Sequence, residues 1–321
     1  SSRPRVHAIP AALGPRVAIS APPRQALRGL RPQVLPATRA SHPVGAGSPH
    51  RAFYPAPLCA THPLMSDAPV LTDLDEQGVL TITMNRPTRR NAFNSEAFLA
   101  MRDAFAEANA DSRVAVVLLT GAGDDFSSGL DLSAIDMNPD EEPPFELMMD
   151  AICAFDKPLV CAAMGCAIGF GATVLFHADV VYLGQSAKLR FPFVSLGLVT
   201  EAAAAYLGPA TIGHKQAAEL LFTAELFGAE KALEYGMATR VFPDDELLTK
   251  ALEKAREIAQ WPIDSLVGIK RIMKATHGDK VALARKLEME GFAALMGSPA
   301  NMEAFSAFME RRPPDFKQFR R

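Results

Sequence analysis

Short apolar runs and helical patterns alternate along the first part of the sequence, and helical patterns prevail after about residue 200. The stretch GVLTITMN (78–85) alternates apolar and polar positions and is rich in β-formers, which predicts a strand. In residues 94–111, Phe98, Met101 and Phe105 lie near helical spacing, which predicts a helix. The same reasoning predicts strands at 114–120, 158–164 and 179–184, and helices at 145–155, 171–177, 200–208, 214–223, 229–236, 245–260, 265–275, 279–296 and 301–312. This order favours an α/β core followed by a C-terminal helical region.

Two of the predicted helices begin beside residues that commonly cap helices. Asn94 or Ser95 can accept a hydrogen bond from the first turn of the helix at 94–111. Thr200 can do the same for the helix at 200–208.

A long uncharged stretch, LVCAAMGCAIGFGATVLF, covers residues 159–176 and raises the question of a membrane span. Gly165, Gly169 and Gly171 interrupt it, and a strand-like run, VVYLG, follows almost at once. We therefore expect a buried strand, a glycine turn and a helix, and no membrane span.

Residues 1–64 differ in composition from the remainder of the chain. They contain eight arginines, no lysine, no acidic residue and twelve of the 25 prolines. Proline recurs too often there for a helix or a central strand, so we expect a disordered Pro/Arg-rich extension. An arginine-rich, acid-free segment is typical of an organelle transit peptide, although the prolines would break its amphipathic helix. The alternative is that the protein proper begins at Met65, after an upstream extension.

The charge of residues 65–321 argues against nucleic acid as the main partner. This part holds 25 Lys and Arg against 36 Asp and Glu, a net charge of −11. The four cysteines form neither a disulfide framework nor a zinc-binding pattern, so we expect no metal site. Cys161 and Cys166 lie in apolar sequence, where reduced thiols pack well. We expect a cytoplasmic location, or the mitochondrial matrix if residues 1–64 are a transit peptide.

Two predicted strands end in small residues that lead into a further element: VAVVLLTGAGDDFSSGLDL (114–132) and KPLVCAAMGCAIGFGATV (157–174). Small residues before a glycine let another group approach the backbone closely, although a tight turn after a core strand is the simpler alternative. Free N–H groups at the first turn of a helix point outward and favour negative charge. Two such turns side by side could hold one oxyanion, such as the enolate or tetrahedral intermediate of a thioester.

These segments and several others resemble the enoyl-CoA hydratase/isomerase, or crotonase, superfamily, in the family's order and over essentially all of residues 70–319. The matching segments are TITMNRPTRRNAFNSEAF, VVLLTGAGDDFSSGLDLSAI, KPLVCAAMGCAIGFGATV, HADVVYLGQSAKLRFPFVSLGLV, FGAEKALEYGMATRVFP and MEAFSAFMERRPPDF. The resemblance implies an α/β fold with a crotonase-like spiral of ββα units at 65–257 and a C-terminal α-helical oligomerisation region at 258–321. It also implies an acyl-CoA thioester as the ligand, with no cofactor beyond the coenzyme A moiety of the substrate.

The assembly that the resemblance implies is a homotrimer or a dimer of trimers. Apolar residues of the C-terminal region exceed what one peripheral helical layer needs, which favours subunit contacts there. These residues are Leu266, Ile269, Met273, Phe292, Leu295 and Met296.

Carried over residue by residue, the family's two oxyanion-binding amides fall on Ser128 and Phe170. Phenylalanine stands where family members often have glycine; it keeps the N–H group and narrows the wall of the pocket. The loop that cradles the adenine end of coenzyme A corresponds to Gly129, Leu130, Asp131 and Leu132.

The segment NRPTRRNAF (85–93) matches the part of the family that meets the phosphates and the pantetheine of coenzyme A. The contact with pantetheine falls at Ala92. Because Thr88 replaces the usual lysine, Arg89 or Arg90 would supply the charge for the phosphates. The alternative is that the two arginines form a solvated basic turn.

The residues that decide the reaction differ from those of the hydratases. Hydratases of this family place two glutamates around a water, and the corresponding positions here are Thr173 and Phe193, neither of which is an effective proton shuttle. Glu201 lies where the peroxisomal type of Δ3,Δ2-enoyl-CoA isomerase carries its single catalytic glutamate. One base suffices for that reaction, because a proton moves from C2 to C4 through a dienolate and no water is activated.

Other interpretations remain open at this point. Glu201 could instead be an acidic first-turn residue that opposes a helix dipole. Asp131 and Asp136 are more typical of a turn acceptor and a solvated loop charge than of catalysts, and His177 and His214 of packed or surface histidines. The alternative functions are a 2-enoyl-CoA hydratase, another thioester reaction such as hydrolysis, and a non-catalytic acyl-CoA-binding or scaffold protein. RNA binding at the basic stretch GIKRIMKATHGDK fits the acidic net charge least well.

Overall fold

The computed structural model describes residues 67–133 and 142–320. The extension expected at 1–64, and Asp136, lie outside these described residues.

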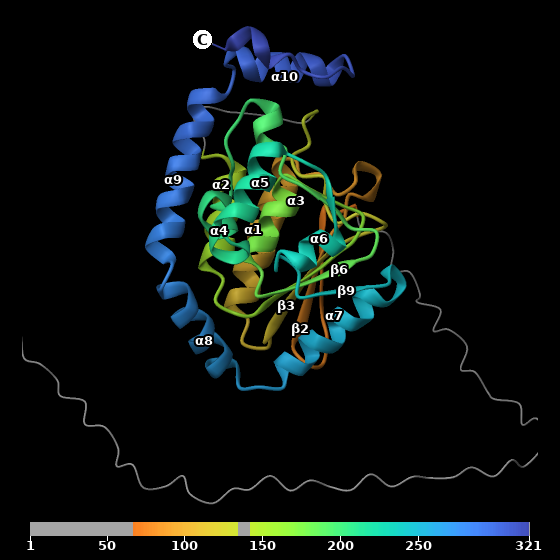
Figure 1. Ribbon diagram of the computed structural model, residues 1–321. Coiled ribbons are helices and arrows are strands. Elements are labelled where there is room, and N and C mark those ends of the chain that lie inside the picture. Colours follow the sequence, from red (N-terminus) through yellow and green to blue (C-terminus); the bar gives the residue numbers. More distant parts are fainter. Residues whose placement is uncertain (1–66, 134–141, 321) are drawn as a thin grey trace, which may run out of the picture. The chain divides into compact units, whose positions relative to one another are not determined.

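A six-stranded sheet forms the centre of the fold (Figure 1). Its strands, in spatial order, are β1 (Val70–Leu74), β2 (Val79–Met84), β3 (Val116–Gly121), β4 (Leu159–Ala163), β6 (Val180–Gly184) and β9 (Arg240–Phe242). β1 and β2 pair antiparallel, and every later pair in this sheet is parallel. The carboxyl ends of β2, β3, β4 and β6 therefore lie at one edge, which is where parallel sheets commonly carry their sites.

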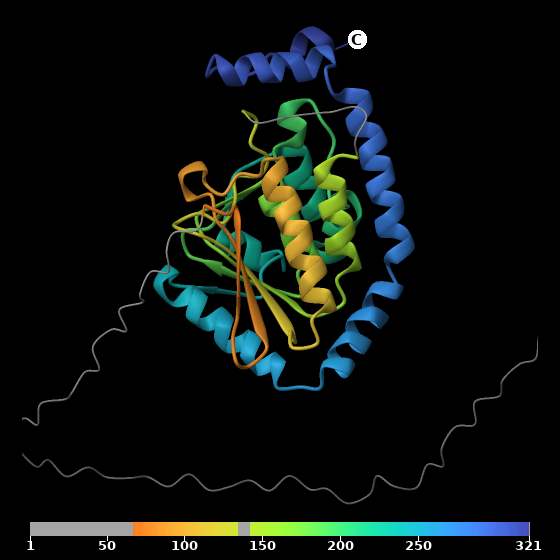
Figure 2. The ribbon, with the colours of Figure 1, turned by 180° about the vertical axis from the view of Figure 1, so that it is seen from behind.

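Both faces of this sheet are covered by helices (Figure 1 and Figure 2). On one face, α7 (Asp244–Ala259) packs Leu247 and its neighbours against Val116 and Leu118 of β3. On the other, α1 (Ser95–Ala110) and α2 (Pro144–Ala154) join the cluster that contains Val117 and Leu119. The alternation of β3 side chains between the two clusters explains why residues 116–119 are all apolar.

A second, three-stranded sheet consists of β5 (Cys166–Ile168), β7 (Lys188–Arg190) and β8 (Phe227–Gly228). The uncharged stretch 159–176 thus contains two strands, β4 and β5, and then α3 (Phe170–Thr173) and the 3₁₀ helix η2 (Val174–His177). It folds inside the core, as expected, although a strand occupies part of the predicted glycine turn. Among the described residues, no helix is both long and apolar enough to cross a membrane.

The remaining α-helices lie within four residues of predicted helices, whereas the remaining 3₁₀ helices are not among the predictions. The α-helices are α4 (Ala204–Ile212), α5 (His214–Thr223), α6 (Ala229–Glu234), α8 (Ile263–Ala275), α9 (Gly278–Leu295) and α10 (Pro299–Met309), and the 3₁₀ helices are η1 (Pro87–Arg89), η3 (Phe193–Leu196) and η4 (Phe316–Phe319). The chain is an α/β fold with two sheets and C-terminal helices.

Of the two predicted helix caps, one is confirmed and one is wrong. Asn94 Oδ1 accepts a 3.0 Å hydrogen bond from the amide of Ala97, as expected for a helix cap. Thr200 caps nothing: α4 begins only at Ala204, and the Thr200 hydroxyl donates to Glu288 of α9. The observed helix α4 therefore starts four residues after the predicted start at Thr200.

The region expected to mediate oligomerisation is helical and carries exposed apolar side chains. Ile269 and Met273 of α8 are 59% and 55% exposed, and Met296 is also exposed. Leu266, Phe292 and Leu295 are half-buried. The helix α7 continues to Ala259, two residues beyond the expected boundary at 257. Subunit contacts at these residues stay a prediction.

Candidate active site

The Glu201 carboxylate is held through one oxygen and leaves the other unpartnered. Its Oε1 accepts a 2.6 Å hydrogen bond from the hydroxyl of Thr173, which is fully buried in α3. Its Oε2 is buried and has no hydrogen-bond partner among the described residues. Burial raises the pKa of Glu201 to about 8; the Thr173 hydrogen bond opposes this rise, and the charges of Glu288 and Glu146 add to it. The arrangement provides a proton acceptor that titrates near neutral pH.

Glu201 precedes a tight turn and does not lie in the first turn of a helix. Ala202 and Ala203 adopt left-handed conformations, with φ of 56° and 59°, before α4 begins. His177 Nε2 lies 2.7 Å from the Ala202 carbonyl oxygen and donates to it as the neutral ring, because burial lowers the pKa of His177 to about 4. The interpretation of Glu201 as a solvated residue opposing a helix dipole is therefore wrong, and His177 is a packed histidine. His214 is exposed at the start of α5.

The two segments of small residues after β3 and β4 lie side by side, and their close approach explains why their side chains are small. The amide of Ser127 donates to the Cys166 carbonyl and the amide of Ile168 donates to the Ser127 carbonyl, both at 2.9 Å. At Gly129, φ is 82°, and a β-carbon would lie 2.6 Å from the Ile168 carbonyl oxygen and 3.3 Å from the Phe170 nitrogen. Only glycine fits this close approach of two backbones.

The amide expected at Ser128 is not free. It donates a 2.9 Å hydrogen bond to the Arg90 carbonyl oxygen, so the assignment of this amide to an oxyanion is wrong. Leu130 pairs with Phe93 in a parallel β-bridge. The amides of Phe93 and Asp131 donate the two hydrogen bonds of this bridge, and the amide of Leu130 has no acceptor among the described residues. In the part of the chain that the structure describes, Leu130 therefore carries the one amide of the SSGLD stretch without an acceptor.

The amide of Phe170, the second expected donor, has no acceptor within the described part of the chain. The side chain of Phe170 is buried among three other rings, with centroid distances of 5.2 Å to Phe93, 5.7 Å to Phe145 and 6.2 Å to Phe98. The ring is held inside this aromatic cluster. Thr173, which binds Glu201, lies one turn further along α3, and its hydroxyl is also 3.3 Å from the Phe170 carbonyl oxygen.

The basic segment at 86–90 is paired with the loop that follows β3. Asp131 contacts Arg86 at 3.1 Å and Arg89 at 3.3 Å, and Arg90 forms two hydrogen bonds with Asp125. The Arg90 partner lowers the pKa of Asp125 to about 2. Arg89 and Arg90 remain 52% and 62% exposed, so both guanidinium groups stay accessible to a phosphate.

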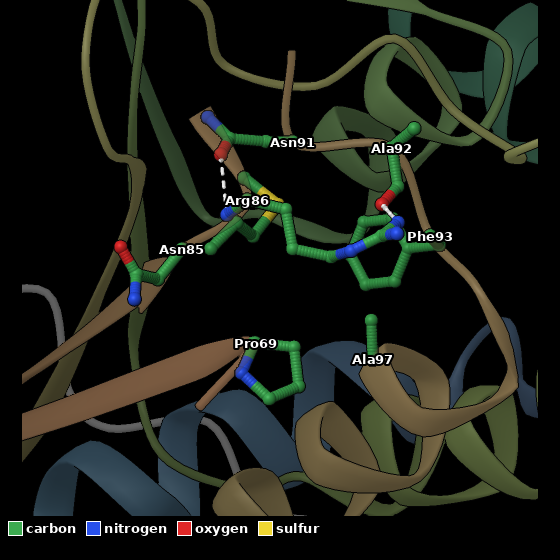
Figure 3. Close-up of a pocket in the computed structure, with 8 residues that line it drawn as sticks. Pro69, Asn85, Arg86, Asn91, Ala92, Phe93 and Ala97 are labelled. Carbon is green, nitrogen blue, oxygen red and sulfur yellow. Dashed lines mark hydrogen bonds between the residues drawn. The ribbon is translucent and has the colours of Figure 1, made fainter. Parts of the chain in front are cut away.

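Arg86 has a structural role that its sequence context does not reveal. Its guanidinium donates to the Ala92 carbonyl oxygen, and its amide donates to Asn91 Oδ1 at 2.9 Å (Figure 3). Asp131 Oδ1 also accepts from the Ser133 amide and hydroxyl, at 3.2 Å and 2.7 Å, which makes Asp131 the expected turn acceptor. These contacts fix the path of the chain past Ala92.

Two hollows lie away from Glu201. The crevice in Figure 3 is too narrow for a water molecule; its lining residues are Pro69, Met84, Asn85, Arg86, Asn91, Ala92, Phe93 and Ala97. The second, of about 390 Å³, is lined by Asp124, Met164, Gly165, Ser186, Asp244 and Asp245, whose acidic groups would repel coenzyme A phosphates. In residues 67–133 and 142–320, no three His, Cys, Asp or Glu side chains are grouped so that they could hold a metal ion.

The family model for enoyl-CoA hydratase/isomerase matches residues 75–320. The chain belongs to the enoyl-CoA hydratase/isomerase family. It is 32% identical over 251 residues to the 1,2-epoxyphenylacetyl-CoA isomerase of Escherichia coli (strain K12), covering 75% of this chain and 95% of that relative. It is 29% identical over 246 residues to the enoyl-CoA delta isomerase 2 of Rattus norvegicus, covering 74% of this chain and 63% of that relative.

Among solved structures, the chain is similar to an enoyl-CoA hydratase/isomerase from Pseudoalteromonas atlantica T6c. The TM-score is 0.74 at 36% identity, covering 77% of this chain and 99% of that one. The crotonase fold and the family are therefore established, and with them an acyl-CoA thioester chemistry.

Proposed function

We propose that this protein is a Δ3,Δ2-enoyl-CoA isomerase in which Glu201 is the single proton shuttle. The observation that carries the proposal is the Glu201 carboxylate, which has one oxygen bound by Thr173 and the other buried and unpartnered. The two positions that supply glutamates in hydratases hold Thr173 and Phe193, both buried. No second carboxylate is therefore offered at these positions to activate a water.

The reaction requires one base and one oxyanion site. Ionised Glu201 removes a proton from C2 of a 3-enoyl thioester. The C–H electron pair forms a double bond between C1 and C2, and the carbonyl π electrons move onto the thioester oxygen, which gives a dienolate conjugated with the C3–C4 double bond. The amides of Leu130 and Phe170 stabilise the resulting dienolate. Protonated Glu201 then returns the proton at C4, so the double bond lies between C2 and C3 and the carboxylate is regenerated.

Coenzyme A binding is assigned to the segments on either side of the Arg86–Asp131 contact. Arg89 and Arg90 meet the phosphates, because both guanidinium groups remain exposed while paired. The loop from Gly129 to Leu132 receives the adenine end, and the chain at Ala92 contacts the pantetheine. The exposure of Leu130 and Leu132 supports a ligand contact on this loop.

Two relatives of this chain, an epoxyphenylacetyl-CoA isomerase and an enoyl-CoA delta isomerase, are isomerases of coenzyme A thioesters, which supports isomerisation as the reaction. The alternatives are a 2-enoyl-CoA hydratase or another thioester reaction, and a non-catalytic acyl-CoA-binding protein.

Product analysis by mass separates these functions. The protein is incubated with a 3-enoyl-CoA and, separately, with a 2-enoyl-CoA. We expect conversion of the 3-enoyl-CoA to a conjugated 2-enoyl-CoA of unchanged mass. A product heavier by one water would identify a hydratase, and free coenzyme A would identify a hydrolase. Tight binding without any product would leave only the acyl-CoA-binding function.

We also propose a trimer, or a dimer of trimers, built through the C-terminal helices. The exposed side chains of Ile269 and Met273 lie on α8, and further exposed apolar residues follow on α9 and α10: Leu283, Leu287, Met289, Met302, Phe305, Phe308 and Met309. This much exposed apolar surface on successive helices is typical of a protein interface.

A further inference from the structure

The turn that presents Glu201 has an unfavourable backbone conformation. Ala202 and Ala203 are consecutive non-glycine residues with positive φ, a conformation in which the β-carbon approaches the following carbonyl oxygen. Ala203 also stands at the cap position of α4 and offers no side chain to accept from the first-turn amides. Such a turn persists only where surrounding contacts determine it.

Glu288 of α9 supplies those contacts. Its Oε2 accepts a 2.7 Å hydrogen bond from the Ala203 amide, and its Oε1 accepts 2.8 Å hydrogen bonds from the Ala205 amide and the Thr200 hydroxyl. The side chain is 6% exposed. Glu288 thus caps α4 from a helix that is distant in the sequence, and it accepts hydrogen bonds from residues before and after Glu201.

The helix that carries Glu288 is itself fixed to the body of the protein. Arg285, one turn earlier in α9, forms 2.7 Å ion pairs with Glu146 and Asp150 of α2. Because α2 belongs to the main hydrophobic core, the position of Glu288 is defined relative to that core.

Glu288 and Glu201 differ in their hydrogen bonding. Both oxygens of Glu288 accept hydrogen bonds from the turn, whereas Glu201 keeps Oε2 without a partner. Glu288 is therefore unsuited to exchange protons with a substrate.

We propose that Glu288 is a positioning residue for catalysis, which fixes the turn so that Glu201 reaches Thr173 and presents Oε2 to the substrate. This inference rests on the proposed function of Glu201 as the base. It assigns to the C-terminal helical region a direct part in the geometry of the active site. A displacement of about 1 Å in a reacting group can reduce turnover about 100-fold.

The test compares Glu288→Gln with Glu290→Gln, a matched exposed glutamate on the same helix. Isomerisation of a 3-enoyl-CoA is measured as kcat and KM, and folding is checked by thermal unfolding. We expect Glu288→Gln to lower kcat about 10- to 100-fold with KM within about twofold, and Glu290→Gln to match the wild type.

A milder pair of substitutions at Thr200 tests the proposal if the Glu288→Gln variant does not fold. Thr200→Val removes one of the three donors to Glu288, and Thr200→Ser retains the hydroxyl. We expect Thr200→Val to lower kcat and Thr200→Ser to restore it. Wild-type kcat in both Glu288→Gln and Thr200→Val would overturn the proposal.

The double variant Glu201→Gln/Glu288→Gln separates positioning from general damage. If Glu288 acts through Glu201, the double variant is as slow as Glu201→Gln alone. If the two losses multiply, Glu288 supports the fold in general and the positioning role is refuted. A fully active Glu201→Gln variant would instead show that the proposed function itself has failed.

Discussion

The hydroxyl of Thr173 donates a 2.6 Å hydrogen bond to Oε1 of Glu201 and thereby orients the carboxylate that we propose as the base. The bond occupies one oxygen and leaves the buried Oε2 as the atom available to a substrate proton. It also opposes the rise in the Glu201 pKa that burial causes. One side chain thus affects both the direction and the basicity of the proposed base.

Replacing Thr173 should shift the pH dependence of turnover. Thr173→Val removes the hydrogen bond, so the pKa of Glu201 should rise above about 8 and a smaller fraction should be ionised at pH 7. We expect kcat/KM at pH 7 to fall about tenfold and to recover partly at higher pH. The measurement is the pH profile of kcat/KM.

Two matched variants control for packing. Thr173→Ser keeps the hydroxyl and should keep the wild-type profile. Thr120→Val removes a comparable hydroxyl, which donates to the Ala162 carbonyl oxygen at 3.0 Å, away from Glu201. A Thr173→Val profile that coincides with the wild type would contradict the role of this hydrogen bond.

Glu201→Gln should abolish proton transfer and leave ligand binding intact. The amide keeps the size of the side chain but is not a base, so turnover should fall about 10²–10⁴-fold. The dissociation constant for an acyl-CoA, measured by calorimetry, should change little. Equal turnover in the variant would exclude Glu201 as the shuttle.

The same substitution should change how stability depends on pH. The pKa of Glu201 is about 8 in the folded protein against a usual value of 4.5, so between these pH values the folded state keeps a proton that the unfolded state loses. The free energy of unfolding therefore falls as pH rises from about 4.5 to 8. Denaturant unfolding at several pH values should show a weaker fall in Glu201→Gln.

The sequence predicts the α/β core well, because its strands are apolar and its helices have periodic faces. β2, β3, β4 and β6 coincide with predicted strands within a few residues. The strands that it does not predict include β1, which has five residues, and the short strands β5, β8 and β9, whose two or three residues are too few for a periodic signal. Their existence depends on the partners that tertiary folding brings to them.

The site could be predicted where it depends on side chains and less well where it depends on backbone direction. Glu201 is recognisable from its motif, whereas the donor at Leu130 follows from the parallel bridge with Phe93. No residue type specifies which amide of the SSGLD stretch points away from that bridge. Glu288 lies 87 positions after Glu201, and its capping role follows only from the packing of α9 beside α4.

Gly129→Ala should damage both stability and activity more than the same change at an open position. The added β-carbon would lie 2.6 Å from the Ile168 carbonyl oxygen, where neither backbone can yield easily. Gly236→Ala is the control, because Gly236 has a similar φ of 79° and no atom within 4 Å of its β-carbon position. We expect about 1–2 kcal/mol loss at Gly236 from backbone strain alone, and a larger loss at Gly129. Denaturant unfolding measures both, and equal losses would contradict the close approach.

Charged substitutions on α8 should prevent formation of the proposed trimer or dimer of trimers. Ile269→Glu/Met273→Glu places two carboxylates on side chains that are more than half exposed in the single chain, so the monomer should fold while an apolar interface should not form. Leu248→Glu, at an exposed apolar residue of α7, is the control. Sedimentation velocity at micromolar concentration should give a trimer or hexamer for the wild type and the control, and a monomer for the double variant. A monomeric wild type would rule out the assembly.

An amide-to-ester replacement should distinguish the two candidate donors on the SSGLD stretch. Incorporating the α-hydroxy analogue of leucine at position 130 removes the N–H group and keeps the side chain. If Leu130 is an oxyanion donor, kcat should fall about 10²–10³-fold with a nearly unchanged melting temperature.

The matching ester at position 128, from the α-hydroxy analogue of serine, removes the donor that bonds the Arg90 carbonyl oxygen. This change should lower stability by about 1 kcal/mol and reduce turnover far less than the ester at 130. Ser128→Ala should change turnover and stability very little, because it leaves the backbone amide in place. The contrary outcome is an active ester at 130 together with an ester at 128 whose kcat falls about 10²–10³-fold. The oxyanion would then bind at the Ser128 amide. The hydrogen bond between that amide and the Arg90 carbonyl oxygen would have to break when substrate enters.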